Sequence, residues 1–142
     1  MFEYIEFIIC YGEGVSPEDV KREDRAKELV FARHLIMYFS VILGVGSYTL
    51  IGELMGKDHA TISHALKAIA NYIGTDKAVK AKIGYYDKLL RKVLKLTAKT
   101  DDLRGVLKPL EEQISELEQR CINLSLQVAF LKTNLKTKVL TT

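Results

Sequence analysis

The sequence predicts an all-α protein in two parts: a small helical domain over residues 1–97 and a coiled-coil helix over residues 98–142, whose last few residues we expect to fray. Three observations predict this class. Only 2 of the 142 residues are proline, and helix-forming Leu, Lys, Ala and Glu are plentiful. Helix-capping residues and glycines divide the first 76 residues into short helical segments. Leucine then recurs every seven residues from Leu103 to Leu131, which is typical of a coiled coil.

Composition excludes several other classes of protein. Apolar residues make up 48% of the chain and charged residues 27%, as in a globular protein with a core. The longest apolar run, residues 1–11, contains Glu3 and Glu6 and is too short to span a bilayer, so we expect no membrane segment. Cys10 and Cys121 form no metal or redox motif, so we expect no metal site and a cytoplasmic location.

Positive charge is concentrated in the middle of the chain. Residues 1–20 carry five acidic side chains and no basic one. Residues 21–100 carry 15 Lys or Arg against 7 Asp or Glu, a net charge of +8. This segment could bind an anionic partner, although a solvated lysine-rich face explains the charge equally well.

The first half of the chain contains clear helix boundaries. Residues 1–11 form a short buried helix that Gly12 and Gly14 end. Ser16 is an N-cap with Pro17 at the first helical position. A longer helix over residues 25–43 is expected to bury Leu29, Ala32, Ile36 and Phe39, and Gly44 to Gly46 end it.

The next two helices form a helix-turn-helix pattern. Ser47 caps a helix over residues 48–55, Gly56 ends it, and Asp58 caps a second helix over residues 59–73. The second helix would enter a major groove, although many helical hairpins that bind no DNA share this pattern. A basic amphipathic helix over residues 76–96 follows, and we expect it to pack on the core with its outer side facing solvent or phosphate.

Three segments resemble the C-terminal domain of the chromosomal replication initiator family (DnaA). The segment Ile51–Ala65, with Asp58-His59-Ala60-Thr61 at its centre, is similar to the family's signature. Ala32–Phe39 resembles the helix upstream, and Val15–Arg25 resembles the entry segment. The resemblance covers about residues 5–95. It implies a Trp-repressor-like helix-turn-helix of the DnaA domain IV type, which binds double-stranded DNA at a DnaA-box-like site.

The resemblance also implies roles for individual residues. Arg25 would enter the minor groove, and Asp58, His59 and Ala60 would read bases in the major groove. An aspartate accepts from a cytosine amino group, a histidine bonds a base edge and an alanine methyl packs on a thymine methyl. Asp58 could instead serve only as a helix cap, and His59 could be a solvated residue. The expected phosphate contacts are Lys27, Arg33, Ser47, Lys57, Thr61, Ser63, His64 and Lys67; for His64 the alternative is a packing role.

The sequence departs from the family pattern in two ways. The family usually has Thr or Ser at Ala60, Arg at Lys57, Gln at His34 and two glycines at Gly56, so we expect a DNA box that differs from the usual one. The family's ATPase module is also missing. The string Gly52–Asp58 is one residue too short for a phosphate loop and has Asp where Ser or Thr would bind magnesium. We therefore expect no enzyme activity, no nucleotide and no cofactor.

The last third of the chain has an uninterrupted heptad pattern. Its expected dimerisation residues, which alternate between d and a positions, are Leu110, Ile114, Leu117, Cys121, Leu124, Val128, Leu131 and Leu135. Leucine at every d with β-branched Ile114 and Val128 at a favours two parallel strands. Tyr86, Leu89, Val93 and Leu96 keep the same frame upstream, so we expect the helix to run on nearly unbroken, with a bend near Gly105–Pro109. The alternative is an amphipathic helix that folds back on its own domain.

Together these patterns predict a sequence-specific DNA-binding homodimer, a regulator or accessory factor in replication initiation, with origin binding, or in transcription. One alternative is a coiled-coil scaffold whose basic domain binds a protein. Another is an initiator that recruits a separate ATPase. The Asp-His-x-Thr string at a helix start favours DNA binding over the scaffold, because a scaffold has no need of it.

Overall fold

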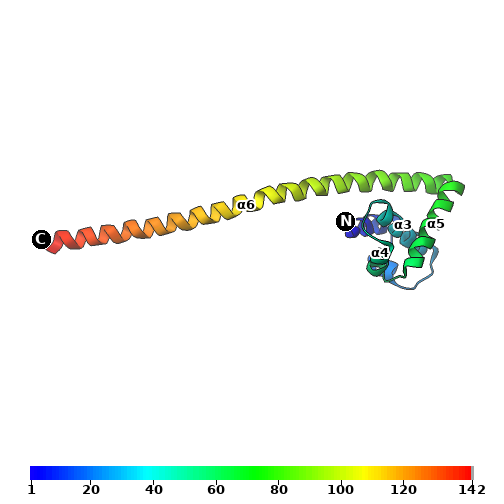
Figure 1. Ribbon diagram of the computed structural model, residues 1–142, viewed down its shortest axis with the longest axis horizontal. Coiled ribbons are helices and arrows are strands. Elements are labelled where there is room, and N and C mark those ends of the chain that lie inside the picture. Colours follow the sequence, from blue (N-terminus) through cyan, green and yellow to red (C-terminus); the bar gives the residue numbers. More distant parts are fainter. Residues whose placement is uncertain (142) are drawn as a thin grey trace. The chain divides into compact units, whose positions relative to one another are not determined.

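The computed structural model describes residues 1–141, and every regular element in that range is a helix (Figure 1). The all-α class is therefore confirmed. The elements are α1 (Phe2–Glu13), α2 (Pro17–Lys21), α3 (Lys27–Ile42), α4 (Tyr48–Met55), α5 (His59–Thr75) and α6 (Lys77–Thr141). The chain divides into a compact unit, Met1–Leu96, and a second unit that begins at Thr97. Helix α6 starts in the first unit and supplies the helix of the second.

Local capping interactions set most helix boundaries. The Ser16 hydroxyl accepts a hydrogen bond from the Asp19 N–H at 3.1 Å, and the Ser47 hydroxyl accepts from the Leu50 N–H at 3.2 Å. These are the N-caps that the sequence predicts. The first helix differs slightly from expectation, because Gly12 lies within α1 and Gly14 alone ends it, in the left-handed conformation at φ 68°. A left-handed residue after the last turn costs glycine little, since it has no Cβ.

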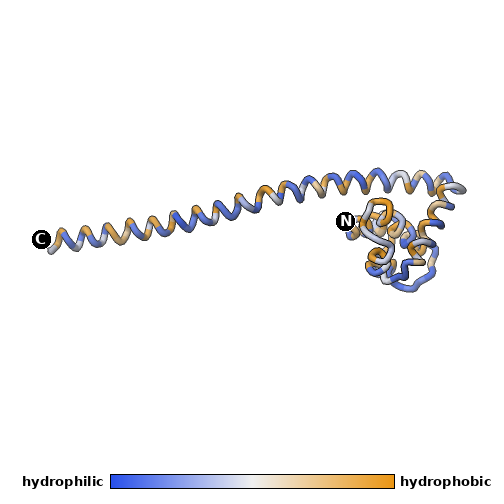
Figure 2. Tube along the Cα trace, in the orientation of Figure 1, coloured by the Kyte–Doolittle hydropathy of each residue, from blue (hydrophilic) through white to orange (hydrophobic). Residues whose placement is uncertain are grey.

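Helix α3 is central to the first unit, since α1, α2, α4 and α5 all pack against it. Its predicted core residues Leu29, Ala32, Ile36 and Phe39 are all buried. The Phe39 ring meets Tyr86 of α6 at 6.5 Å between centroids, and the Tyr86 hydroxyl donates to Glu13 Oε1 at 2.8 Å. The start of α6 thus belongs to this core. Figure 2 shows apolar segments gathered in this unit, whereas apolar and polar residues alternate along α6.

The turn between α4 and α5 is unusually close-packed. Gly56 adopts φ 64°, and the Lys57 N–H donates back to the Gly52 carbonyl at 2.7 Å. A Cβ placed on Gly52 would lie 2.5 Å from the Lys57 carbonyl oxygen. A side chain at position 52 would therefore push the turn away from α4, so the geometry of the helix-turn-helix depends on this glycine.

Helix α6 runs without interruption through Pro109, the point near which a bend was expected. Proline has no N–H, so the Gly105 carbonyl loses its partner four residues on, and the helix continues despite that loss. All side chains from Ala98 to Thr141 are exposed, including the whole predicted leucine seam. Within residues 1–141 no helix combines the length and apolarity needed to cross a membrane.

We predict that Gly52→Ala lowers the free energy of unfolding of the first unit by about 1–3 kcal/mol, because the new methyl group overpacks against backbone. Gly84→Ala is the matched control, since a Cβ there meets open space on helix α6. That change should raise stability by about 0.5–1 kcal/mol. Urea unfolding followed by circular dichroism measures both. Equal effects of the two substitutions would show that the turn is not tightly packed.

Candidate nucleic-acid interface

The start of α5 presents an exposed polar surface. Asp58 occupies the N-cap position, and its backbone carbonyl accepts from the Thr61 N–H at 2.9 Å. Its carboxylate makes no capping hydrogen bond; instead Oδ1 lies 2.7 Å from Nδ1 of His59. About 70% of each of these two side chains is exposed, and Ala60 beside them is also exposed. Asp58 is thus a cap by backbone position only, and its carboxylate is available to a ligand.

The Asp58–His59 contact determines what His59 can offer. In the neutral imidazole, Nδ1–H donates to the carboxylate, so Nε2 is left as a hydrogen-bond acceptor. Such an acceptor suits the exocyclic amino group of adenine or cytosine, which is exposed in the major groove. The pair therefore presents two acceptors at the first turn of the helix.

A cleft of about 390 Å³ brings together predicted residues that lie far apart in the sequence. Arg25, from the segment between α2 and α3, lines one part of it. Lys57 and Thr61, from the α4–α5 turn and the first turn of α5, line another. Lys27 is exposed at the first position of α3. The cleft therefore places cations beside the first turn of α5, whose free N–H groups favour an anion.

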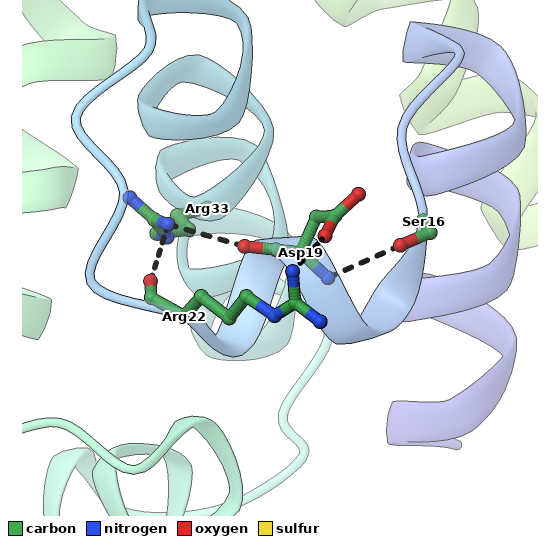
Figure 3. Close-up of polar contacts among 4 residues, drawn as sticks. All are labelled: Ser16, Asp19, Arg22 and Arg33. Carbon is green, nitrogen blue, oxygen red and sulfur yellow. Dashed lines mark hydrogen bonds and ion pairs between the residues drawn. The ribbon is translucent and has the colours of Figure 1, made fainter.

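Arg33 differs from its expected role as a phosphate contact. The side chain is only 8% exposed, and its guanidinium donates to four backbone carbonyls, those of Asp19, Val20, Arg22 and Asp24. Figure 3 shows Arg33 reaching across to α2 and the segment that follows it. Because its donors are engaged within the protein, we assign Arg33 the role of holding the segment that carries Arg25.

His34 also lines the cleft, although the sequence pattern does not predict it as a site residue. Its ring meets that of His64 edge-on at 5.8 Å between centroids. Burial lowers the pKa of His34 below its ordinary value of 6.5, and the nearby His64 and Arg33 lower it further. His34 is therefore neutral at pH 7. In the sequence, His34 follows Arg33 in the segment that resembles the DnaA family, at a position where that family usually has glutamine. This departure is the sequence signal that could have identified His34 as a site residue.

The remaining predicted contacts lie on α5 and at the N-cap of α4. His64 and Lys67 are exposed on α5, and Ser63 is half-buried there. Ser47 is exposed, although its hydroxyl is already engaged in capping α4. Among residues 1–141 no three His, Cys, Asp or Glu side chains lie close enough together to hold a metal ion. The arrangement gathers basic and polar side chains around the first turn of α5, with the acidic Glu23 and Asp24 lining the same cleft.

Comparison with known proteins identifies the same region. Residues 2–69 match the family described as the bacterial DnaA protein helix-turn-helix. The chromosomal replication initiator protein DnaA of Caldanaerobacter subterraneus subsp. tengcongensis is 33% identical over 75 residues, which are 53% of this chain and 17% of the relative. The proteins of the same name from Bacteroides thetaiotaomicron (30% over 86 residues) and Thermodesulfovibrio yellowstonii (34% over 92 residues) match 60% and 64% of this chain. These matches cover 18% and 20% of those two relatives, so the chain spans about a fifth of the length of the proteins it resembles.

We predict that Arg33→Met lowers the free energy of unfolding by about 3 kcal/mol, because buried carbonyls lose a charged donor. Arg22→Met is the control, since the Arg22 side chain is exposed and forms a surface ion pair with Asp19. Its effect should stay within about 0.5 kcal/mol. Thermal unfolding of both variants gives the comparison. If Arg33→Met proves as stable as the parent protein, the four carbonyls do not depend on this side chain.

Proposed function

We propose that this chain, whose residues 2–69 carry a helix-turn-helix of the bacterial DnaA type, is a sequence-specific double-stranded DNA-binding protein that recognises a short DnaA-box-like site. One observation carries the proposal. The cations Arg25 and Lys57 line one cleft, and they come from either side of α3 in the sequence, next to the exposed surface of Asp58, His59 and Ala60. Specific DNA binding needs two components: cations that hold phosphates, and polar groups that read bases. The cleft and the neighbouring exposed surface would supply one each.

The mechanism divides the residues into two groups. Lys57, Thr61 and the N–H groups of the first α5 turn hold backbone phosphates, with Lys27 and Lys67 at the periphery. Asp58 and His59 offer acceptors to base amino groups in the major groove, and the Ala60 methyl packs on a thymine methyl. Arg25 enters the minor groove, where the negative potential attracts a guanidinium. Arg33 contributes by positioning the segment that carries Arg25.

The second unit makes this binding protein a homodimer. Its apolar seam from Leu110 to Leu135 is exposed to water in a single chain, and pairing with a second copy would bury it. Each such side chain contributes about 1.5–3 kcal/mol on burial. A dimer carries two DNA-binding units, which suits paired boxes. We place the protein in the cytoplasm with the DNA, as a non-catalytic regulator or accessory factor in replication initiation or transcription.

One observation favours the second candidate function, a scaffold that binds a protein. Phe7, Tyr11 and Tyr85 are 65%, 82% and 64% exposed, and they line a cleft of about 450 Å³ between α1 and α6. Exposed aromatic side chains of this kind are common at protein interfaces. The two functions differ in their dependence on salt. A phosphate-held complex weakens steeply as salt rises, with a log–log slope of about −0.9 for each phosphate contact.

We predict that His59→Ala costs about 1–3 kcal/mol at the cognate site and leaves binding to random DNA nearly unchanged, because a base contact is lost. Lys57→Ala should instead weaken binding to every sequence alike and reduce the salt slope by about 0.9. The cognate site is first selected from a random pool, and fluorescence anisotropy then gives both affinities. Equal losses on cognate and random DNA for His59→Ala would contradict its reading role. A slope shallower than about −2 for the parent protein would favour the scaffold.

We predict that the full chain sediments as a dimer at tens of micromolar and that Leu124→Lys makes it monomeric, since a charge in the seam cannot be buried. Leu126→Lys is the matched control, because it adds the same charge two residues away on the opposite helix face. Sedimentation equilibrium distinguishes the three proteins. A monomeric parent chain would refute the coiled-coil dimer, and an unaffected Leu124→Lys variant would place the interface elsewhere.

A further inference from the structure

We infer that the two α6 helices pair antiparallel, in the register that sets Leu110 of one chain opposite Leu135 of the other. The inference rests on the homodimer proposed above and concerns its orientation. It replaces the parallel pairing that the types of a and d residues favour. Because α6 is one uninterrupted helix from Lys77 to Thr141, its heptad positions keep a single frame. The residues that face each other can therefore be compared for every pairing register.

Both orientations bury the same seam. In this antiparallel register every a residue faces a d residue, so Ile114 meets Leu131 and Leu117 meets Val128. All eight seam positions from Leu110 to Leu135 then have apolar partners, as they do in a parallel pair. The two antiparallel registers that are shifted by one heptad bury the seam less completely or bring like charges together. One of them leaves Leu110 without an apolar partner in the seam, and the other places Glu118 opposite Glu118 and Arg120 opposite Arg120.

Side-chain size in the middle of the seam separates the two orientations. A parallel pair sets Cys121 against Cys121, so two small side chains leave a poorly filled layer. In the antiparallel pair each Cys121 faces Leu124, and the layers have more even volumes. Packing that alternates large and small side chains across an interface avoids such voids.

Charge along the helix favours the same orientation. Residues 111–120 carry Glu111, Glu112, Glu116 and Glu118 with Arg120, a net charge of −3. The cations Lys132, Lys136 and Lys138 all follow the middle of the seam. A parallel pair places the acidic segment beside its own copy and offers no complementary e–g pair. The antiparallel pair removes that repulsion and sets Glu111 opposite Lys132 twice, once at each end.

The orientation determines where the two DNA-binding units are attached. In this register the two Leu110 residues lie about 38 Å apart along the coiled coil, at about 1.5 Å per residue. The units therefore join it at opposite ends, whereas a parallel coil would join them at the same end. The antiparallel dimer thus suits two separated boxes.

Disulfide cross-linking of the full chain tests orientation and register together. Cys121→Ser is the background, and Cys10 stays unreactive because burial raises the pKa of its thiol to about 11. Ile114→Cys and Leu131→Cys are made separately, one with a size tag, and oxidised with diamide alone and as a 1:1 mixture. We expect cross-linking in the mixture to exceed that of either variant alone by about tenfold, because a disulfide needs Cα atoms about 4.4–6.8 Å apart. Two Ile114→Cys residues would lie about 25 Å apart.

A second pair and a control keep the result interpretable. Leu117→Cys with Val128→Cys should behave like the first pair, in case one variant fails to fold. Gln119→Cys lies outside the seam in both orientations and should not cross-link. Efficient cross-linking of each variant alone would establish the parallel coil and overturn the inference. A sedimenting dimer in which neither mixture cross-links would overturn the register. A monomer by sedimentation would refute the proposed dimer itself, and the inference with it.

Discussion

The buried guanidinium of Arg33 is the interaction on which the arrangement of the candidate interface depends. Its donors reach carbonyls of α2 and of the segment that follows, so one side chain ties that segment to the central helix α3. The segment contains no regular structure between Lys21 and Lys27 and therefore has few internal hydrogen bonds of its own. Without Arg33 its carbonyls would turn to water, and Arg25 would lose its fixed place in the cleft that Lys57 also lines.

The same helix links the interface to the core. Phe39 and Ile36 of α3 are fully buried, and the inner face of α5, with Ile62, Ala65 and Ile69, packs into the same cluster. The close approach at Gly52 and the left-handed Gly56 then fix how α5 leaves the turn. Hydrophobic burial thus determines the position of the helix, and the two glycines determine its direction. The polar residues at its start can be exposed because neither is needed for packing.

The second unit follows a different physical constraint. Helix α6 has no core of its own beyond residue 96, and its leucine seam is exposed along its whole length. A helix of this length is stable when its apolar stripe is buried against another helix. The seam is uniform in hydrophobicity, so burial alone does not choose an orientation. Side-chain volume at Cys121 and the separation of acidic from basic residues along the helix therefore become decisive in the pairing we infer.

Sequence alone determined the elements with short-range causes. Interactions within a few residues set these elements, and a sequence pattern records such interactions. The elements are the caps at Ser16 and Ser47, the glycine ends at Gly14 and Gly56, the buried face of α3 and the helix-turn-helix. Tertiary structure decided three other features: the role of Arg33, the contact between the His34 and His64 rings, and the absence of a side-chain capping bond at Asp58. Each depends on groups that meet only after the helices pack. An arginine in a basic segment looks the same in sequence whether its donors meet phosphate or four carbonyls of its own chain, and only the fold places those carbonyls within reach.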